Sequence, residues 1–338
     1  WSSDVCSSDL NGHYMTGDGN HHRMVEVDMM GNTIHNWDML ERGYTMHHAI
    51  SQDKQGNILA TVSKTSAKIA NGKDVRINDF IIMMDPEKGE ILQEWDLVHM
   101  LDSARYGMTD YDLTSDPFAQ SASNWAHNNG IVEWGDDYLA TARYQGIFKF
   151  NKAGGIEWII SPHGYWRDKY LKLLLNPLHA DGTPITDPEV IAGTKNCDDF
   201  EWPWGCHTAV PLPNGHILYF NNGYGRNFKL DFTDRKNIYT CGIEYEVDEV
   251  NRTVRQVWQY GKERGAAYFT PARSGVQYLE QTGNRLICPG MSNVLSNGNR
   301  GARVTEVDPE TQDVVFELEL EDAIYQRVYR MSLYPENQ

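Results

Sequence analysis

Short runs of alternating apolar and polar residues recur along the chain in a fixed arrangement. A run ends at Asp or Asn, the chain turns through Gly or polar residues, and a return run ends at Trp or Leu. The copies occupy residues 25–37, 81–95, 148–158, 245–258 and 304–318. Alternation with a period of two, joined by turn-forming residues, predicts a β-hairpin. The sequence therefore predicts five hairpins.

A second pattern precedes four of these hairpins. It is a short strand, a turn, and a second strand such as Gly-Asn-Ile-Leu, and its copies begin near residues 46, 125, 206 and 276. Joined to the hairpins, these strand pairs predict repeated four-stranded units, none of which can bury a core alone. The prediction is an all-β fold of the β-propeller class, with each unit forming a blade.

The two ends of the chain do not complete a blade in this interpretation. Residues 12–38 supply only outer strands of the first blade, and residues 328–333 supply an innermost strand without its blade. We therefore expect a propeller that is N-terminally truncated, with five blades plus partial strands in this chain. Residues 1–10 resemble translated adapter or vector sequence and are set aside, so the single domain is expected at residues 11–338. An export signal lost upstream fits this expectation.

Three long segments interrupt the repeat, around residues 97–124, 162–204 and 227–240. Because they are rich in aromatic, Pro and charged residues, we expect loops with short helices that cover one face of the ring. Loops longer than ordinary connections are more often functional than idle.

Charge and hydropathy remove several classes of partner. The 338 residues carry a formal net charge of −17 without any basic run, which argues against nucleic acid as a partner. No apolar run is long enough to span a membrane. An acidic protein that acts on an anion needs a local group of Arg and His against its overall field.

Such a group is predicted at the centre of the ring. The innermost strand of a blade lines the central channel, and three of these strands carry histidines: His47 and His48, His127, and His207. Alternation sends His47 and His48 to opposite faces of their strand, and we favour His48 as the one that lines the channel. Imidazole serves as nucleophile, acid or base, and Arg donates two hydrogen bonds to a tetrahedral oxyanion. Transfer of a sulfuryl or phosphoryl group needs both functions.

The cysteines say little about whether the protein lies in an oxidising or a reducing compartment. Cys197 and Cys206 flank an aromatic loop and are candidates for a disulfide, whereas Cys241 and Cys288 lie in predicted strands and are expected as buried thiols. No CxxC motif is present, which excludes a zinc ribbon.

Three stretches resemble the bacterial arylsulfate sulfotransferases, which work without a nucleotide sulfate donor. They are residues 125–158, residues 206–226 (CHTAVPLPNGHILYFNNGYGR) and residues 242–265 (GIEYEVDEVNRTVRQVWQYGKERG), and the likeness covers most of residues 20–334. The resemblance implies a six-bladed β-propeller that is generally exported. It also implies sulfate transfer from one phenol to another through a sulfated histidine.

Matching motifs carry family roles onto individual residues. The HxN strand matches His127 with Asn129 beside it, the QHTA-like strand matches His207, and the NGxGR turn matches Arg226. At the position of the sulfate-accepting histidine the chain has Asn293, and no histidine follows His216. An amide is not a nucleophile, so three outcomes stay open: another inner-strand histidine such as His207 or His127 takes the sulfate, transfer is direct, or the chemistry is lost.

The resulting hypothesis is a transferase that moves a sulfuryl group from an aryl sulfate to a phenol, in the periplasm or outside the cell. His207, His127 and Arg226 are the expected catalytic residues. The expected substrate-binding residues are His48, Asn129, Arg143, Asn293, Tyr224 and Arg330, with Trp202 and Trp204 as further aromatic contacts. Neither a metal nor an organic cofactor is expected, and a homo-oligomer stays open. The alternatives are a non-catalytic propeller that binds an anionic or aromatic ligand, and an aryl sulfate hydrolase on the same scaffold.

Overall fold

The computed structural model describes residues 6–8, 13–17, 22–71, 74–105, 125–229, 233, 236–292 and 294–321. These residues form five sheets that follow one another along the chain. The first contains β1 (Cys6–Ser8), β2 (Tyr14–Gly17), β3 (Arg23–Val27) and β4 (Thr33–Asp38). The second contains β5 (Tyr44–Gln52), β6 (Ile58–Asn71), β7 (Asp74–Met84) and β8 (Ile91–Asp96). The third contains β9 (Asn128–Trp134), β10 (Asp137–Ala142), β11 (Gly146–Phe150) and β12 (Ile156–Ile160).

The fourth and fifth sheets repeat the pattern. The fourth contains β13 (Asn176–Leu178), β14 (His207–Pro211), β15 (Ile217–Asn221), β16 (Cys241–Asp248) and β17 (Thr253–Tyr260). The fifth contains β18 (Ser274–Tyr278), β19 (Arg285–Pro289), β20 (Gly301–Val307) and β21 (Val314–Glu321). The helices are short: α1 (Leu97–Met100), α2 (Asp168–Leu171), α3 (Pro188–Ala192) and α4 (Gly265–Tyr268), with 3-10 turns at Arg226–Phe228 and Lys262–Arg264.

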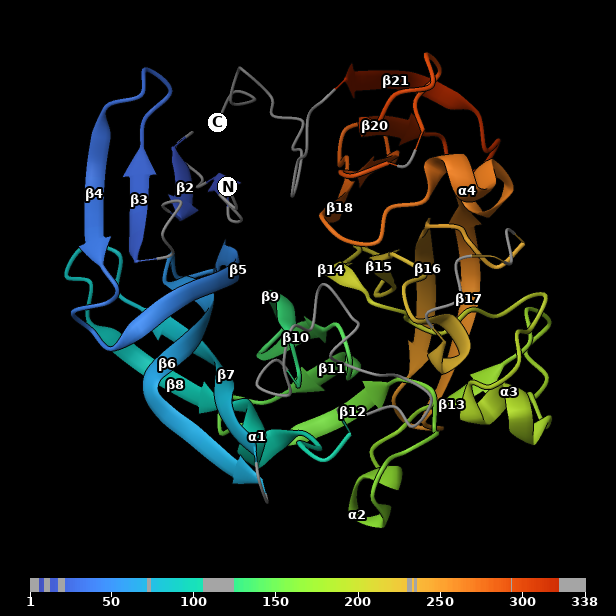
Figure 1. Ribbon diagram of the computed structural model, residues 1–338, viewed down its shortest axis with the longest axis horizontal. Coiled ribbons are helices and arrows are strands. Elements are labelled where there is room, and N and C mark those ends of the chain that lie inside the picture. The colour runs from blue at the N-terminus through green and yellow to red at the C-terminus, as the bar shows by residue number, and fades with distance from the viewer. Residues whose placement is uncertain are drawn as a thin grey trace.

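The sheets are arranged as blades around a common centre, which confirms the predicted propeller (Figure 1). Four consecutive strands of each blade form an antiparallel meander, and β5, β9, β14 and β18 form edges that face the centre. The histidine-bearing strands are therefore innermost, as predicted. We call the region where these inner strands meet the hub.

Two details of the blades differ from the prediction. The first sheet has a fourth strand, β1, which pairs with β2 and comes from the residues set aside as foreign sequence. Backbone pairing does not depend on the origin of a sequence, so that origin stays a prediction. The segment 162–204 forms the expected short helices but also adds β13, which pairs in parallel with β17. The tail strand expected at residues 328–333 lies outside the described residues.

The repeated Asp or Asn caps the turn of each hairpin. In the first hairpin, Asp28 Oδ1 accepts hydrogen bonds of 2.8 Å from the backbone N–H groups of Met30 and Asn32. The same type of cap is made by Asp85, Asn151, Asp248 and Asp308. These side chains mimic a backbone turn, which explains why the position recurs in every copy.

In the first three blades, the repeated Trp contacts the following blade. Trp95 Nε1 donates a 3.0 Å hydrogen bond to the carbonyl of Lys152 in the turn of the following blade. Trp37 packs so closely on Gly89 of the following blade that a Cβ there would lie 2.5 Å from its ring. The pattern of the sequence thus encodes contacts between blades as well as the blades themselves.

The core is divided among the blade interfaces. Four apolar clusters each join two consecutive sheets. In β15, Ile217 and Tyr219 belong to the cluster shared with the third sheet, and Leu218 and Phe220 to the cluster shared with the fifth. Because β15 is buried on both faces, its residues 217–220 are all apolar, unlike the alternating outer strands. Among the described residues, no helix has the length and apolar character needed to cross a membrane.

Candidate functional site

Each histidine-bearing inner strand contains a β-bulge next to its histidine. In β5, residues 47–49 lie opposite the single residue Thr61, whose Oγ1 accepts the N–H groups of His48 at 2.9 Å and Ala49 at 2.8 Å. In β9 and β14, the extra residues are Asn129 and Thr208. A bulge adds residues without a cross-strand partner and redirects the side chains beside it.

The backbone at these bulges includes strained conformations. The φ angle is +53° at His127 and +31° at Thr208. Residues other than glycine seldom adopt such values, and they persist only where surrounding contacts enforce them. Local strain of this kind occurs often at functional sites, which draws attention to these strands.

The bulges bring four imidazoles together at the hub. His48 Nε2 lies 2.8 Å from His127 Nε2, and the His47 ring lies 4.2 Å from His48 and 5.1 Å from His127, between centroids. The His207 ring lies 6.4 Å from that of His48. We call His47, His48, His127 and His207 the hub histidines. The expectation that His47 and His48 point to opposite faces is wrong, because the bulge breaks the alternation.

The hydrogen bond between His48 and His127 has a preferred direction. Among the described residues, His48 Nδ1 is buried without a hydrogen-bond partner. A neutral imidazole carries one proton, which is best placed on the nitrogen that has an acceptor. His48 Nε2–H therefore donates to His127 Nε2. Burial, together with the neighbouring hub histidines and Arg143, holds the pKa of His48 and of His127 well below 6.5.

A hydrogen bond to Asn222 determines the tautomer of His207. Asn222 Nδ2 donates to the Thr270 carbonyl at 2.9 Å, so its other side-chain atom is the oxygen. This oxygen accepts from Ser274 Oγ at 3.2 Å and lies 2.6 Å from His207 Nδ1. His207 Nδ1 must therefore carry the proton, which leaves the lone pair of the neutral ring on Nε2.

Arg143 supplies a guanidinium beside the hub. Its Cζ lies 4.4 Å from the centre of the Tyr224 ring, and its Nη2 donates a 2.8 Å hydrogen bond to the Pro271 carbonyl. Its backbone N–H donates to the carbonyl of His127 at 2.9 Å, which fixes the two residues relative to each other. Arg143 is 3% exposed, so its charge acts in a medium of low polarity.

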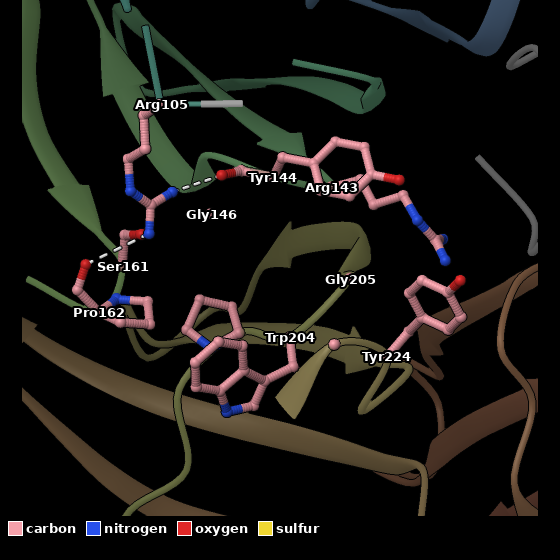
Figure 2. Close-up of a pocket in the computed structure, with 11 residues that line it drawn as sticks. Arg105, Arg143, Tyr144, Gly146, Ser161, Pro162, Trp204, Gly205 and Tyr224 are labelled. Carbon is pink, nitrogen blue, oxygen red and sulfur yellow. Dashed lines mark hydrogen bonds between the residues drawn. The ribbon is translucent and has the colours of Figure 1, made fainter. Parts of the chain in front are cut away.

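A partly open pocket adjoins this cation, and the space between its walls, including the part open to solvent, is about 320 Å³. Figure 2 shows Arg105 and Arg143 on opposite sides of it, with Trp204 and Tyr224 between them along one wall. Tyr144 also lines the pocket, and its ring centroid lies 6.2 Å from that of His127. Aromatic walls with a cation near the hub suit a flat ring that carries an anionic substituent.

Arg105, which the sequence did not single out, closes the far side of this pocket. Its guanidinium lies 4.5 Å from the Trp166 ring and donates to the carbonyls of Tyr144, Gly164 and Pro162. Burial lowers the pKa of Arg105 to about 9.

The sequence also did not single out Asp79. This residue is buried at the hub, and its Oδ1 lies 3.7 Å from His47 Nδ1. No sequence motif marked Arg105 or Asp79, whereas Asn222 lies within the quoted NNGYGR stretch.

The structure gives Arg226 a different environment from the expected one. Its Nε and Nη2 each lie 2.7 Å from Glu201 Oε1, and its Cζ lies 3.7 Å from the centre of the Tyr239 ring. Nη1 donates to the Asn237 carbonyl at 2.7 Å. Although burial opposes it, Glu201 raises the pKa of Arg226. This guanidinium holds the segment that leads from Glu201 to the pocket wall, and Arg143 is the cation beside the hub.

The remaining predicted residues divide into four groups. Asn129 Nδ2 donates to the Cys206 carbonyl at 2.9 Å and so connects β9 to β14. The predicted disulfide is wrong: Cys197 and Cys206 are free thiols, with Cys206 buried and Cys197 hydrogen-bonded to Asp199. Cys241 and Cys288 are buried thiols, as expected. Asn293 and Arg330 lie outside the described residues.

The nitrogens of His47, His48 and His127 lie within 4.8 Å of one another, close enough for a metal ion. Asp79 lies beside His47, but burial raises the pKa of its carboxyl. The guanidinium of Arg143 acts on both His48 and His127, so the hub favours an anion over a cation. The arrangement of imidazoles, guanidinium and aromatic pocket thus suits an aryl ester of a tetrahedral oxyanion.

Comparison of the sequence and fold with those of known proteins identifies relatives of this chain. Two similar proteins are the arylsulfate sulfotransferase AssT of Escherichia coli O6:H1, 29% identical over 339 residues, and that of Lelliottia amnigena, 30% identical over 340 residues. Each alignment covers 91% of this chain and 56% of the relative, so the chain spans about half the length of these proteins.

Among solved structures, a protein of unknown function from Bacteroides caccae aligns with a TM-score of 0.50 at 11% identity, covering 94% of this chain and 81% of that one. At this identity the similarity concerns the fold alone. The family profile described as arylsulfotransferase (ASST) matches residues 3–330, and the chain therefore belongs to the arylsulfotransferase family.

Proposed function

We propose that this protein transfers a sulfuryl group from an aryl sulfate to a phenol at the hub. The observation that carries the proposal is the meeting of His48, His127 and His207, from three blades, with Arg143 beside an aromatic pocket. Family membership supports the reaction class, and the two relatives are named arylsulfate sulfotransferases.

The pocket and the hub divide the substrate between them. The aryl ring lies against Trp204 and Tyr224, and the sulfate group points toward Arg143 and the hub histidines. Arg143 offers the hydrogen-bond donors that a charge-dispersed sulfuryl transition state requires. Because Arg143 is buried and already oriented by Pro271 and Tyr224, this electrostatic stabilisation needs little rearrangement.

His207 is the nucleophile in this proposal. Its Nε2 lone pair attacks sulfur, the bond between sulfur and the aryl oxygen breaks, and the aryl oxide leaves with the electron pair. A phenol oxygen then attacks the same sulfur, the sulfur–nitrogen bond breaks, and the lone pair returns to Nε2. Support comes from Asn222, which keeps the proton on Nδ1.

The paired imidazoles of His48 and His127 handle the proton. Neutral imidazoles with lowered pKa can accept the proton of the attacking phenol, and the same pair can then protonate the departing aryl oxide of the next cycle. The proton balance closes over one turnover. This scheme needs no histidine at position 293, where the motif resemblance leads us to expect the family's sulfate acceptor.

Incubation with 4-nitrophenyl sulfate, with and without phenol, tests the proposal. Release of 4-nitrophenol that depends on phenol, with formation of phenyl sulfate, is the expected result. Release without phenol identifies a hydrolase, and binding without release identifies a ligand-binding propeller. Mass spectrometry after rapid quenching should find the sulfated peptide at His207. Its absence, with transfer still occurring, would replace the covalent route by direct transfer.

The cellular location of the protein is also a proposal. Export to the periplasm or the medium follows from the resemblance to a generally exported family. Fractionation of cells that express the full-length gene, with detection of the protein in each fraction, tests this assignment.

A further inference from the structure

A second group of reactive side chains lies on the long segment between β12 and β14. His179 follows β13 directly, and Cys197 and Asp199 follow α3. His179 Nδ1 lies 3.0 Å from Asp199 Oδ1, and Cys197 Sγ lies 3.1 Å from the same oxygen. One atom from each of the three side chains lies within 4.8 Å of the others.

We propose that His179, Cys197 and Asp199 form a binding site for a divalent transition metal of the zinc type. Zinc takes imidazole nitrogen, thiolate sulfur and carboxylate oxygen as ligands, at about 2.0–2.3 Å. A tetrahedral ion at these bond lengths separates its ligand atoms by about 3.3–3.5 Å. Asp199 Oδ1 lies 3.0 Å from His179 Nδ1 and 3.1 Å from Cys197 Sγ, so these two distances need to widen by only a few tenths of an ångström. The sequence excluded a zinc ribbon for lack of a CxxC pair, and no metal was expected for sulfuryl transfer.

The charges at the site balance when the ion binds. In its absence, the Asp199 carboxylate accepts hydrogen bonds from the imidazole and the thiol. The ion displaces the thiol proton to solvent, and the imidazole coordinates through Nδ1 with its proton on Nε2. A thiolate and a carboxylate then carry two negative charges against the two positive charges of the ion.

Neighbouring groups orient the ligands and leave the site accessible. The backbone N–H of Ala180 donates to Asp199 Oδ2 at 2.9 Å, which fixes the carboxylate, and His179 Nδ1 lies 3.0 Å from Oδ1 and 3.2 Å from Oδ2. The side chains of His179 and Asp199 are 39% and 37% exposed, so an ion can enter from solvent and a water can complete its coordination.

The positive charges near this group have carboxylate partners of their own. Arg255, which donates to the Ala180 carbonyl, pairs with Glu246, and Lys195 pairs with Asp187. The hub differs, since Arg143 raises the potential around its histidines. This contrast is why the metal is assigned to the second group.

A bound ion would connect the end of β13 to the segment after α3. That segment continues through Phe200 and Trp202 to Trp204, which lines the pocket. The ion therefore cross-links the segment of chain that supports one wall of the pocket. This role is independent of sulfate chemistry, so its test does not require an active enzyme.

Cobalt titration of the chelator-treated full chain tests the proposal. Wild-type protein should bind one Co²⁺ with a thiolate-to-cobalt charge-transfer band and the visible bands of tetrahedral cobalt, and Zn²⁺ should displace it. Cys197→Ser should lose the charge-transfer band. Asp199→Asn should weaken binding about 100-fold or more, because even outer partners of metal ligands contribute 10–100-fold.

Matched variants separate this site from others. Asp198→Asn removes an exposed neighbouring charge and should leave the spectrum and affinity unchanged. His48→Asn removes a hub imidazole and should also leave the charge-transfer band intact. Zn²⁺ should raise the melting temperature of wild type and Asp198→Asn but not of Cys197→Ser, with circular dichroism confirming that each variant folds. Absence of the band in wild type, or its persistence in Cys197→Ser, overturns the proposal.

Discussion

The orientation of one amide determines which nitrogen of His207 is available for chemistry. Asn222 is held by Thr270 and Ser274, so its oxygen faces His207 Nδ1. We expect Asn222→Ala to lower kcat by about 10- to 100-fold with little change in KM, as when an outer partner of a functional histidine is removed. Kinetics with 4-nitrophenyl sulfate and phenol measure the effect.

The control for this prediction is Asn214→Ala. This change alters an exposed turn that contains His216, and it leaves the hub unchanged. It should leave kcat and KM unchanged. An equal loss in both variants, or a change confined to KM in Asn222→Ala, would contradict the assigned role of Asn222.

Two buried arginines have opposite roles at the scale of single residues. Arg226→Met leaves Glu201 as an uncompensated buried charge and should lower the free energy of unfolding by about 3–5 kcal/mol. Arg143→Met should change stability by less than about 2 kcal/mol and lower kcat/KM by about 10²–10³-fold, the cost of one transition-state donor. Urea unfolding and steady-state kinetics measure both variants. A large loss of stability in Arg143→Met with unchanged kinetics would reverse the two roles.

At the scale of elements, the hairpins were predictable because local chemistry dictates them. The alternating runs and the turn caps, such as Asp28, are contained within a dozen residues. The bulges were not predictable in the same way. They depend on cross-strand partners such as Thr61, which lies 13 residues from His48 and looks like any Thr in a strand. The prediction that His47 and His48 diverge failed for this reason.

The bulge of β5 leads to a prediction about Thr61. Thr61→Val keeps the shape of the side chain but removes the acceptor for the N–H groups of His48 and Ala49. Leaving buried donors unpaired costs about 1–3 kcal/mol, and the loosened bulge should also displace His48 and lower kcat. Thr61→Ser retains the hydroxyl and should retain most of the activity. Equal kinetics for the Val and Ser variants would show that the bulge does not depend on this bond.

At the scale of the whole molecule, the site exists only because blades distant in sequence meet at the hub. The motif resemblance located His127 and His207, and the ring geometry predicted that they converge. It did not reveal that Arg226 pairs with Glu201 while Arg143 lies beside the histidines. Which of the two arginines acts at the hub depends on which guanidinium is paired with a buried carboxylate in the folded protein. No local pattern in either segment records the outcome.

The convergence of the hub histidines makes the stability of the whole molecule depend on pH. The pKa of His48 and of His127 lies well below 6.5 in the native state, because burial and the neighbouring positive groups oppose protonation. In the unfolded chain each takes up a proton near pH 6.5. As pH falls below 6.5 the unfolded state binds more protons than the native state, so stability falls by up to about 1.4 kcal/mol per pH unit for each residue.

Urea unfolding at pH 7.5, 6.5 and 5.5 measures this dependence. Between pH 6.5 and 5.5, His48→Asn should lose less stability than wild type, by about 1 kcal/mol. His22→Asn, which changes an exposed histidine, should follow wild type. Saturating inorganic sulfate should flatten the wild-type curve, because an anion bound at the hub favours the protonated imidazoles. A wild-type slope that neither His48→Asn nor sulfate alters would mean that the hub histidines do not bind an anion in the way proposed.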